Sequence, residues 1–421
     1  MPDISLLMLY GSLFLSLFFE VFLLITYFEV QGEMRAEDEM LAQFLTKPHS
    51  EVSFPTTTII VPSFNEEKTV AATINSLLNL NYPKDKLNLI LVDDGSTDNT
   101  LEVLNSFKNN PQVKVLTKEN GGKHTAVNLA LEHVETELVG CLDADSFVTA
   151  DALKNIVPYF DDVEVKAVTP SIKVYEPGNV IQHIQKTEYS WSIFLRRMLS
   201  SLGALYVTPG PFSIFRRQVF RELGNYKQAH MTEDMEIAMR MQKNYYKIVN
   251  SHRAHVYTVT PSTLKSLVKQ RARWSYGFLN NAFDYRELFF NRKYGHFGMF
   301  IMPIATLSTF TSFIMVTHVV WGWVKRGLQM FNRFQAVGFS SNFSLPSFDW
   351  FFVNTGVLTL VVTIAVVMTI YILYLSLKLA DGKFKLHRGL LYYLFLYAFM
   401  APLWLSKALF DTAFRRKVSW R

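Results

Sequence analysis

The stretch VGCLDADSFV, residues 139–148, ends an apolar run with two acidic side chains, Asp143 and Asp145. The mostly apolar residues 138–142 predict a buried β-strand. In an extended chain the two carboxylates point to the same side, about 6.6 Å apart along the strand, and raise each other's pKa unless a cation holds them. An isolated pair of this kind is also typical of a solvated loop in which Ser146 caps a helix. The rest of the chain decides between these two interpretations.

Three earlier segments repeat the pattern of a short apolar strand followed by polar residues and a helical periodicity. They are TTTIIVPSF (56–64), LNLILV (87–92) and VKVL (113–116). Apolar strands separated by helices predict an α/β fold with a mostly parallel sheet that is covered on both faces. Open sheets of this type bind ligands at the carboxyl ends of their strands.

Polar clusters fall at these strand ends. The clusters are Ser63, Asn65 and Glu66 after the first strand, Asp93 and Asp94 after the second, and Asp143 and Asp145 after the fourth. We expect Asn65 to cap a helix whose first turn holds Glu66. A site with only a few oxygen ligands from the protein suits Mg²⁺ or Mn²⁺, because these ions complete their coordination with water and phosphate oxygens. The shared edge therefore predicts a metal and a diphosphate.

Three further segments carry candidate site residues. In NGGKHTAVN (120–128) two glycines and Lys123 open a helix, which favours an anion, although the glycines also suit a plain turn. HMTEDMEIAMRM (230–241) places Glu233 and Asp234 in a first helical turn, where dipole pairing alone also explains acids. VKQRARWSYGF (268–278) is a basic helical stretch with a Trp, a pattern equally typical of a helix lying on lipid headgroups.

Long apolar segments indicate a membrane protein. The chain has 421 residues, of which 49% are hydrophobic and 14% aromatic. Residues 4–29 exceed the roughly 20 residues of a membrane-spanning helix and have no cleavage site of a signal peptide, so we expect an uncleaved anchor. Three more candidate spans are 297–324, 350–377 and 389–411.

Charge and cysteine content narrow the class of protein. The net charge of +6 suits either nucleic acid or anionic lipid, and four apolar spans favour lipid. A single cysteine, Cys141, excludes an intramolecular disulfide and fits a cytoplasmic location of the segment between the spans. The short basic loop 378–388 also predicts a cytoplasmic insert, whereas three following crossings would leave the basic tail outside, against the same rule.

The ordered set VPSFNEE, VDDGS, GGKHTAVN, DAD, TED and QRARW, bracketed by apolar spans, closely resembles the processive family 2 glycosyltransferases, which include cellulose, chitin, hyaluronan and poly-N-acetylglucosamine synthases. The resemblance covers roughly residues 52–290. It implies a Rossmann-like α/β fold of the GT-A type, a UDP-sugar donor, Mg²⁺ or Mn²⁺, and inverting transfer to a sugar hydroxyl. The TPGP and GGKHTAVN segments depart from the SGP and GKR patterns of hyaluronan synthases, which weakens that assignment.

The resemblance also implies roles for single residues. Asp234 would be the general base, supported by Glu233. The nucleotide-sugar would be bound by Pro62, Asn65, Glu66, Asp93, Asp94, Lys123, Asp143 and Arg273, and the metal by Asp143 and Asp145. The acceptor would be bound by Gly210, Gln270 and Trp274, with Trp274 as a stacking floor for its terminal sugar.

We therefore expect a membrane-embedded synthase that elongates a β-linked polysaccharide, with GlcNAc as the expected sugar, and passes it across the cell membrane. The alternatives are a non-processive transferase that adds one sugar to a lipid carrier and a transporter whose soluble domain only binds nucleotide. The expected partners are the UDP-sugar, the growing polysaccharide and membrane lipid, with room for a small membrane accessory subunit and no role for nucleic acid. The expected parts are an anchor (1–30), a connector helix (31–51), a GT-A domain (52–260), interfacial helices (261–296), about three membrane helices (297–414) and a basic tail (415–421).

Overall fold

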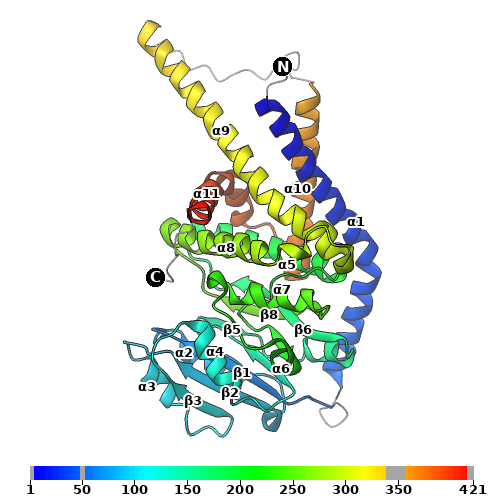
Figure 1. Ribbon diagram of the computed structural model, residues 1–421, viewed down its shortest axis with the longest axis vertical. Helices are drawn as coiled ribbons and strands as arrows, with labels where there is room; N and C mark the ends of the chain where they lie inside the picture. Colours follow the sequence, from blue (N-terminus) through cyan, green and yellow to red (C-terminus); the bar gives the residue numbers. More distant parts are fainter. Residues whose placement is uncertain (1–3, 48–52, 338–355, 415–421) are drawn as a thin grey trace.

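The computed structural model describes residues 4–47, 53–337 and 356–414, which form a mixed α/β domain and a set of long apolar helices (Figure 1). The first half of the domain alternates strands and helices. Its elements are β1 (Thr57–Ser63), α2 (Val70–Leu78), β2 (Leu87–Asp93), α3 (Thr100–Asn105), β3 (Val113–Thr117), α4 (Lys123–Leu131) and β4 (Leu138–Cys141). The four strands predicted from apolar runs are all present, and they pair in parallel in the order β3-β2-β1-β4.

The second half of the domain extends the same sheet with mixed directions. Its elements are β5 (Ser146–Val148), β6 (Val165–Val174), α5 (Val180–Ser201), β7 (Ile214–Arg216), α6 (Gln218–Leu223), α7 (Glu233–Lys243), β8 (Lys247–Thr258) and α8 (Leu264–Asp284). Strand β7 pairs antiparallel to β4 and β6, whereas β6 and β8 are parallel, so the full order is β3-β2-β1-β4-β7-β6-β8-β5. The predicted α/β fold is confirmed, with a sheet that is parallel in its first half and mixed in its second.

Alternating strand residues build one hydrophobic core on each face of the sheet. Ile60 of β1 packs in the cluster that contains Ala126 of α4, while its neighbour Ile59 packs in the cluster that contains Ile74 of α2. Successive side chains of a strand point to opposite faces, so a continuous apolar run is what a sheet covered on both sides requires. The cores hold the strand ends, and therefore the polar clusters, in fixed positions.

The expected helix cap at Asn65 is wrong. Asn65 has a positive φ of 56°, and α2 begins only at Val70. The Asn65 side-chain oxygen instead accepts a hydrogen bond from the backbone N–H of Thr97 at 2.8 Å. Asparagine tolerates the left-handed conformation, and its short side chain can hydrogen-bond to backbone groups of a turn. Its oxygen therefore binds the N–H of Thr97, which is close in space but 32 positions away in the sequence, and does not cap α2.

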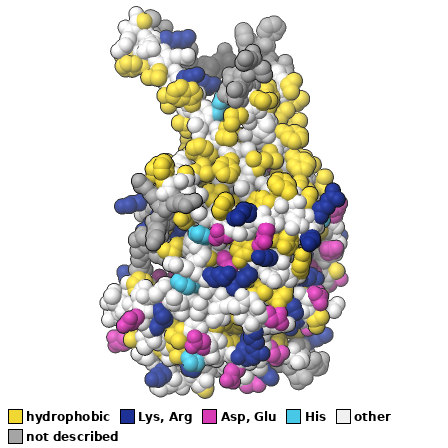
Figure 2. Space-filling model, in the orientation of Figure 1, with side chains coloured by type: hydrophobic (Ala, Val, Ile, Leu, Met, Phe, Trp, Pro, Cys, Tyr) yellow, Lys and Arg dark blue, Asp and Glu magenta, His cyan; other side chains and the backbone are white. Residues whose placement is uncertain are grey.

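Within the part of the chain that the structure describes, four helices are long and apolar enough to cross a membrane. They are α1 (Ile4–Thr46), α9 (Met302–Val337, preceded by a π-helical turn Phe297–Ile301), α10 (Val357–Asp381) and α11 (Arg388–Ala413). Figure 2 shows apolar side chains gathered on the part of the surface formed by these helices, away from the charged surface of the domain. The expected connector helix is continuous with the anchor as far as Thr46, and residues 350–355 of the third predicted span and the basic tail lie outside the described residues.

Helices α5 and α8 lie between the sheet and the apolar helices (Figure 1). Phe194 of α5 packs in one cluster with Leu23 of α1 and Ile372 of α10. Ile184 of α5 and Leu267 of α8 pack with residues of α11 in another. The same two helices therefore contact both the α/β domain and the apolar helices.

Candidate active site

Lys123 links the acidic pair after β4 to the first turn of α7. Its ammonium group forms an ion pair with Asp143 and lies 3.6 Å from the Glu233 carboxylate. Burial alone would lower the pKa of Lys123, but the Asp143 and Glu233 carboxylates outweigh it and hold the pKa well above the ordinary value. Gly210 completes this cluster, because a Cβ atom there would clash with Lys123 Nζ. Residues more than 100 positions apart in the printed sequence thus converge on one ammonium group.

Asp145 lies in an environment that favours a cation. Burial, the charge of Asp143 and the charge of Glu66 raise its pKa to about 7, against one hydrogen bond from Ser146 Oγ at 3.0 Å. A cation between the carboxylates would relieve this repulsion, so the donor set fits a hard divalent ion. Within the described ranges no group of three or more His, Cys, Asp or Glu side chains already forms a complete cation site. The remaining ligands would come from water and a bound diphosphate.

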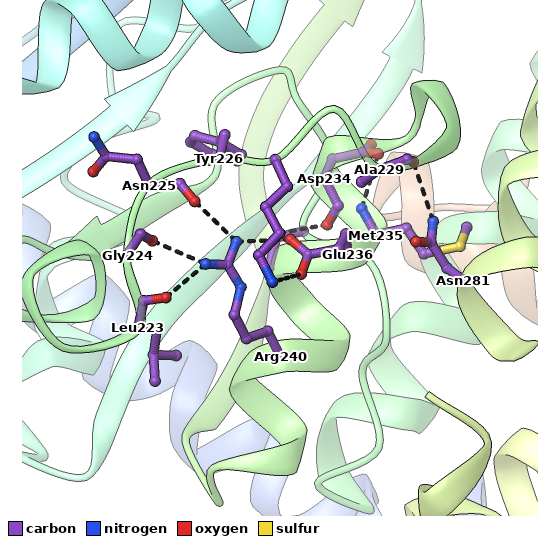
Figure 3. Close-up of polar contacts among 12 residues, drawn as sticks. Leu223, Gly224, Asn225, Tyr226, Ala229, Asp234, Met235, Glu236, Arg240 and Asn281 are labelled. Atoms are coloured by element: carbon purple, nitrogen blue, oxygen red, sulfur yellow. Dashed lines mark hydrogen bonds and ion pairs between the residues drawn. The ribbon is translucent and has the colours of Figure 1, made fainter. Parts of the chain in front are cut away.

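Asp234 lies in the first turn of α7 (Figure 3). It directly follows Glu233 in the sequence. Burial and the neighbouring charge of Glu233 raise the pKa of Asp234 to about 6, although Lys123 and Arg273 act in the opposite direction. Thr208 fixes the backbone at this point, because its N–H and hydroxyl both donate to the Asp234 carbonyl, at 3.1 and 2.8 Å. A carboxyl group tuned in this way is suited to general-base chemistry near neutral pH.

The turn before α7 is strained and is held by one face of α8. Ala229, His230 and Met231 all have positive φ angles, of 40°, 51° and 67°, a conformation that costs non-glycine residues roughly 1–2 kcal/mol each. Arg273 donates to the Met231 carbonyl at 3.1 Å. Gly277 lies four residues further along α8. A Cβ atom at Gly277 would clash with Thr232, the residue that follows Met231, so the glycine leaves room for Thr232.

Asn281 completes the same face of α8. Its side-chain nitrogen donates to Thr232 Oγ1 at 2.8 Å, and Thr232 is the N-cap residue of α7. Positions 273, 277 and 281 are four residues apart and so lie on one side of a helix. The end of α7 that carries Asp234 is therefore docked on the helix that carries the QRARW segment, a contact that sequence analysis missed because its residues are 49 positions apart.

The other end of α7 is fixed by Arg240. Its guanidinium group donates to the carbonyls of Leu223 and Asn225, at 2.6 and 3.0 Å, and to Glu236 at 2.7 Å (Figure 3). Glu236 also accepts a hydrogen bond from Tyr285 at 2.6 Å. Each buried charge is thus paired and hydrogen-bonded, which makes α7 a rigid support for Asp234.

The two acids after β2 have different surroundings. Asp93 closes its own turn, since it accepts from the Ser96 N–H at 3.3 Å. The buried Asp94 carboxylate accepts from Lys118 Nζ at 2.8 Å and from the N–H groups of Gly121 and Gly122 at 3.1 and 2.8 Å. Asp94 thus anchors the glycine pair that opens α4, and Lys118 is a member of this cluster that sequence analysis did not single out.

The remaining predicted residues lie in β1, in the turn that follows it and on α8. Pro62 is part of β1 and pairs with Val92 of β2, whereas Asn65 forms hydrogen bonds with Ser96 and Thr97. Glu66 connects to the acidic pair through its charge on Asp145. Gln270 and Trp274 lie on α8 and both contact Arg271, to which no role was assigned from the sequence.

Residues 58–224 match the family model of glycosyl transferase family 2. Curated relatives include the poly-beta-1,6-N-acetyl-D-glucosamine synthases of Staphylococcus epidermidis, 32% identical over 221 residues, and of Staphylococcus aureus strain COL, 30% identical over 248 residues. These alignments cover 52% and 58% of this chain and 53% and 59% of the relatives, so the match spans a little over half the length of each relative.

Among solved structures, the mannosyltransferase PcManGT of Pyrobaculum calidifontis, in complex with GDP-Man and Mn²⁺, matches with a TM-score of 0.59. The match covers 94% of this chain and 99% of that chain at 19% identity, which shows a shared fold.

Replacing Gly277 with Ala tests the docking of α7 on α8. The added methyl group would push Thr232 away from the helix, so we expect a loss of about 1–3 kcal/mol in the free energy of unfolding and a drop in sugar-transfer rate. Thermal unfolding and initial rates of the purified protein measure both effects. Gly32→Ala on α1, where a Cβ atom meets nothing within 4 Å, is the matched control. Equal behaviour of the two variants would contradict the docking role.

Proposed function

We propose that this chain is a membrane-embedded, inverting, processive glycosyltransferase that polymerises a β-linked polysaccharide from UDP-N-acetylglucosamine and passes the product across the membrane. The observation that carries the proposal is the convergence of the acidic pair after β4 with the first turn of α7 around Lys123. The family 2 domain supports the reaction class. The names of the curated relatives, synthases of poly-beta-1,6-N-acetyl-D-glucosamine, support the sugar and the polymeric product.

The donor would bind at the carboxyl edge of the sheet. Asp143 and Asp145 would hold Mg²⁺ or Mn²⁺, which would neutralise negative charge on the diphosphate. Lys123, already paired with Asp143, would lie along the nucleotide and add positive charge at the same place. Arg273 would stabilise the charge that develops on the diphosphate as it leaves. Asp94 would contact the uridine from the glycine loop that it anchors, with Asp93 beside it and Pro62, Asn65 and Glu66 lining the base and ribose.

Asp234 would act as the general base, with Glu233 supporting it. The acceptor hydroxyl oxygen attacks the anomeric carbon, its proton passes to the Asp234 carboxylate, and the bond from that carbon to the diphosphate oxygen breaks to release UDP. One direct displacement inverts the anomeric centre. The pKa of about 6 leaves Asp234 ionised at neutral pH yet more basic than an exposed aspartate.

The acceptor would lie between the domain and the apolar helices, in contact with Gly210, Gln270 and Trp274. The long apolar helices support a multi-pass location in the cell membrane, with the domain on the cytoplasmic side. The growing polysaccharide and lipid would be its partners, and a small accessory subunit in the membrane remains a further candidate. A non-processive transfer to a lipid carrier is the alternative that product sizing separates from this proposal.

Asp234→Asn tests the reaction directly. The amide keeps the shape of the side chain but cannot accept the proton, so we expect the rate of UDP release from UDP-N-acetylglucosamine to fall by about 10²- to 10⁴-fold. Asp85→Asn, an exposed acid in a 3₁₀ turn, is the control and should keep full activity. Sizing the sugar product of the unaltered protein completes the test. Unchanged turnover in Asp234→Asn would exclude this base, and a product one sugar longer than its acceptor would exclude processive synthesis.

Asp145→Ala tests the metal site. We expect the variant to lose Mn²⁺ binding, measured by calorimetry in the presence of UDP. It should also lose the metal-dependent part of turnover. Thermal unfolding without metal should be unchanged or shifted upward, because removing one of two repelling carboxylates relieves an unfavourable charge. The same metal affinity in the variant and the unaltered protein would show that the ion binds elsewhere.

The pH dependence of turnover reports on Asp234. Its pKa is raised, so the protonated form persists up to about pH 6, and only the deprotonated form accepts the acceptor proton. The rate of UDP release should therefore rise with pH below about 6 and level off above it. Saturating donor and acceptor at each pH isolate the catalytic step. A rate that stays flat from the ordinary aspartate pKa of about 4 to neutral pH would contradict the assignment.

A further inference from the structure

Arg271 is a buried cation in the middle of the QRARW segment. Its side chain lies on α8, and the residue is only 4% exposed. The guanidinium Nε and Nη2 donate to the two carboxylate oxygens of Glu188 on α5, at 2.9 and 2.8 Å. Two parallel charge-assisted hydrogen bonds fix both the position and the plane of the guanidinium group. Glu188 also accepts from the Tyr397 hydroxyl of α11 at 3.2 Å, so three helices meet at this ion pair.

The remaining surfaces of the same guanidinium group are used by the two neighbours to which we assign acceptor binding. Nη1 donates to Gln270 Oε1 at 2.7 Å. The guanidinium carbon lies 4.1 Å from the centroid of a Trp274 ring and 5.8 Å from that of Tyr189. Gln270 and Trp274 are only partly buried, so each keeps surface on which a ligand can bind. One fixed plane therefore orients an amide and an indole together.

We propose that Arg271 is a positioning residue for acceptor binding, which holds the Gln270 amide and the Trp274 ring in the orientation that receives the terminal sugar, and that Glu188 fixes Arg271 for this task. The inference rests on the proposed function and adds two residues to it. Arg271 acts through its neighbours and has no contact with the reacting atoms in this scheme.

Arginine suits this role for a physical reason. Its planar fork bonds a carboxylate through two N–H groups while its face stacks on an aromatic ring, and lysine supplies the charge without the plane. An ion pair that only joined α5 to α8 would need a positive charge and N–H donors opposite Glu188, both of which a lysine ammonium group supplies. Arg271→Lys therefore separates the two roles, because it keeps the charge opposite Glu188 and removes the stacking and the bond to Gln270.

The test uses the full chain in lipid nanodiscs, with UDP-N-acetylglucosamine as donor and short N-acetylglucosamine oligosaccharides as acceptor. We expect Arg271→Lys to raise the acceptor KM by about 2- to 30-fold, the range of a cation–π contact. The donor KM, the slow UDP release without acceptor and the melting temperature should stay near those of the unaltered protein. Lys269→Ala, an exposed position on the same helix, is the matched control and should change none of these quantities.

A double variant that combines Arg271→Lys with Trp274→Ala distinguishes the positioning role from a merely structural one. If Arg271 acts through Trp274, the loss caused by Arg271→Lys should largely disappear once Trp274 is absent, so the two effects on acceptor KM will not add. Glu188→Gln should reproduce the acceptor effect of Arg271→Lys, because the guanidinium group loses its carboxylate partner.

The positioning role would be overturned by an acceptor KM in Arg271→Lys equal to that of the unaltered protein. Additive effects of Arg271→Lys and Trp274→Ala on the acceptor KM would also overturn it. A parallel fall in melting temperature and donor-only UDP release would assign Arg271 to the fold and equally reject the proposal. Failure of the proposed function is distinguishable, because the unaltered protein would then form no polymer; the positioning role, which rests on that function, would fall with it.

Discussion

The arrangement of the site depends on one ammonium group. Four carboxylates, those of Asp143, Asp145, Glu233 and Asp234, gather where β4 ends and α7 begins, and their mutual repulsion would drive these elements apart. Lys123 lies against one member of each pair and keeps its charge despite burial. Because it belongs to the first turn of α4, the helix that packs on the sheet also fixes the cation. The packing of α4 on the sheet thus also determines where the positive charge of the site lies.

Helix α8 connects the site to the apolar helices, and it uses two different faces for these contacts. Positions 273, 277 and 281 hold the strained turn before α7, and therefore Asp234, the proposed base. Arg271 instead faces α5, with Gln270 and Trp274 beside it. A helix with 3.6 residues per turn places adjacent positions about 100° apart, so one short segment can serve both purposes. Arg271 and Arg273 of QRARW thus point to different sides of α8, Arg271 to Glu188 of α5 and Arg273 to the turn before α7.

Much of the sheet and of the shared edge could be predicted, because apolar runs bounded by polar turns are local signals. The pairing of β6 with β8 could not, since it joins segments about 80 residues apart, such as Val165 and Lys247, and carries register shifts. The same limit applies to the site. Asp143 and Asp234 could be named from short motifs, whereas the contact of Asn281 with Thr232 depends on how α7 and α8 cross.

The dependence of the site on the apolar helices follows from what α5 contacts. Its Phe194 is fully buried among side chains of α1 and α10, and its Ile184 among those of α8 and α11. Glu188, on the same helix, pairs with Arg271 and with Tyr397 of α11. A displacement of α11 would thus move the carboxylate that fixes Arg271, and with it the Gln270 and Trp274 side chains that contact Arg271. Packing among the apolar helices and orientation of the proposed acceptor site are therefore coupled through the Glu188–Arg271 ion pair, whereas the Lys123 cluster is held within the α/β domain.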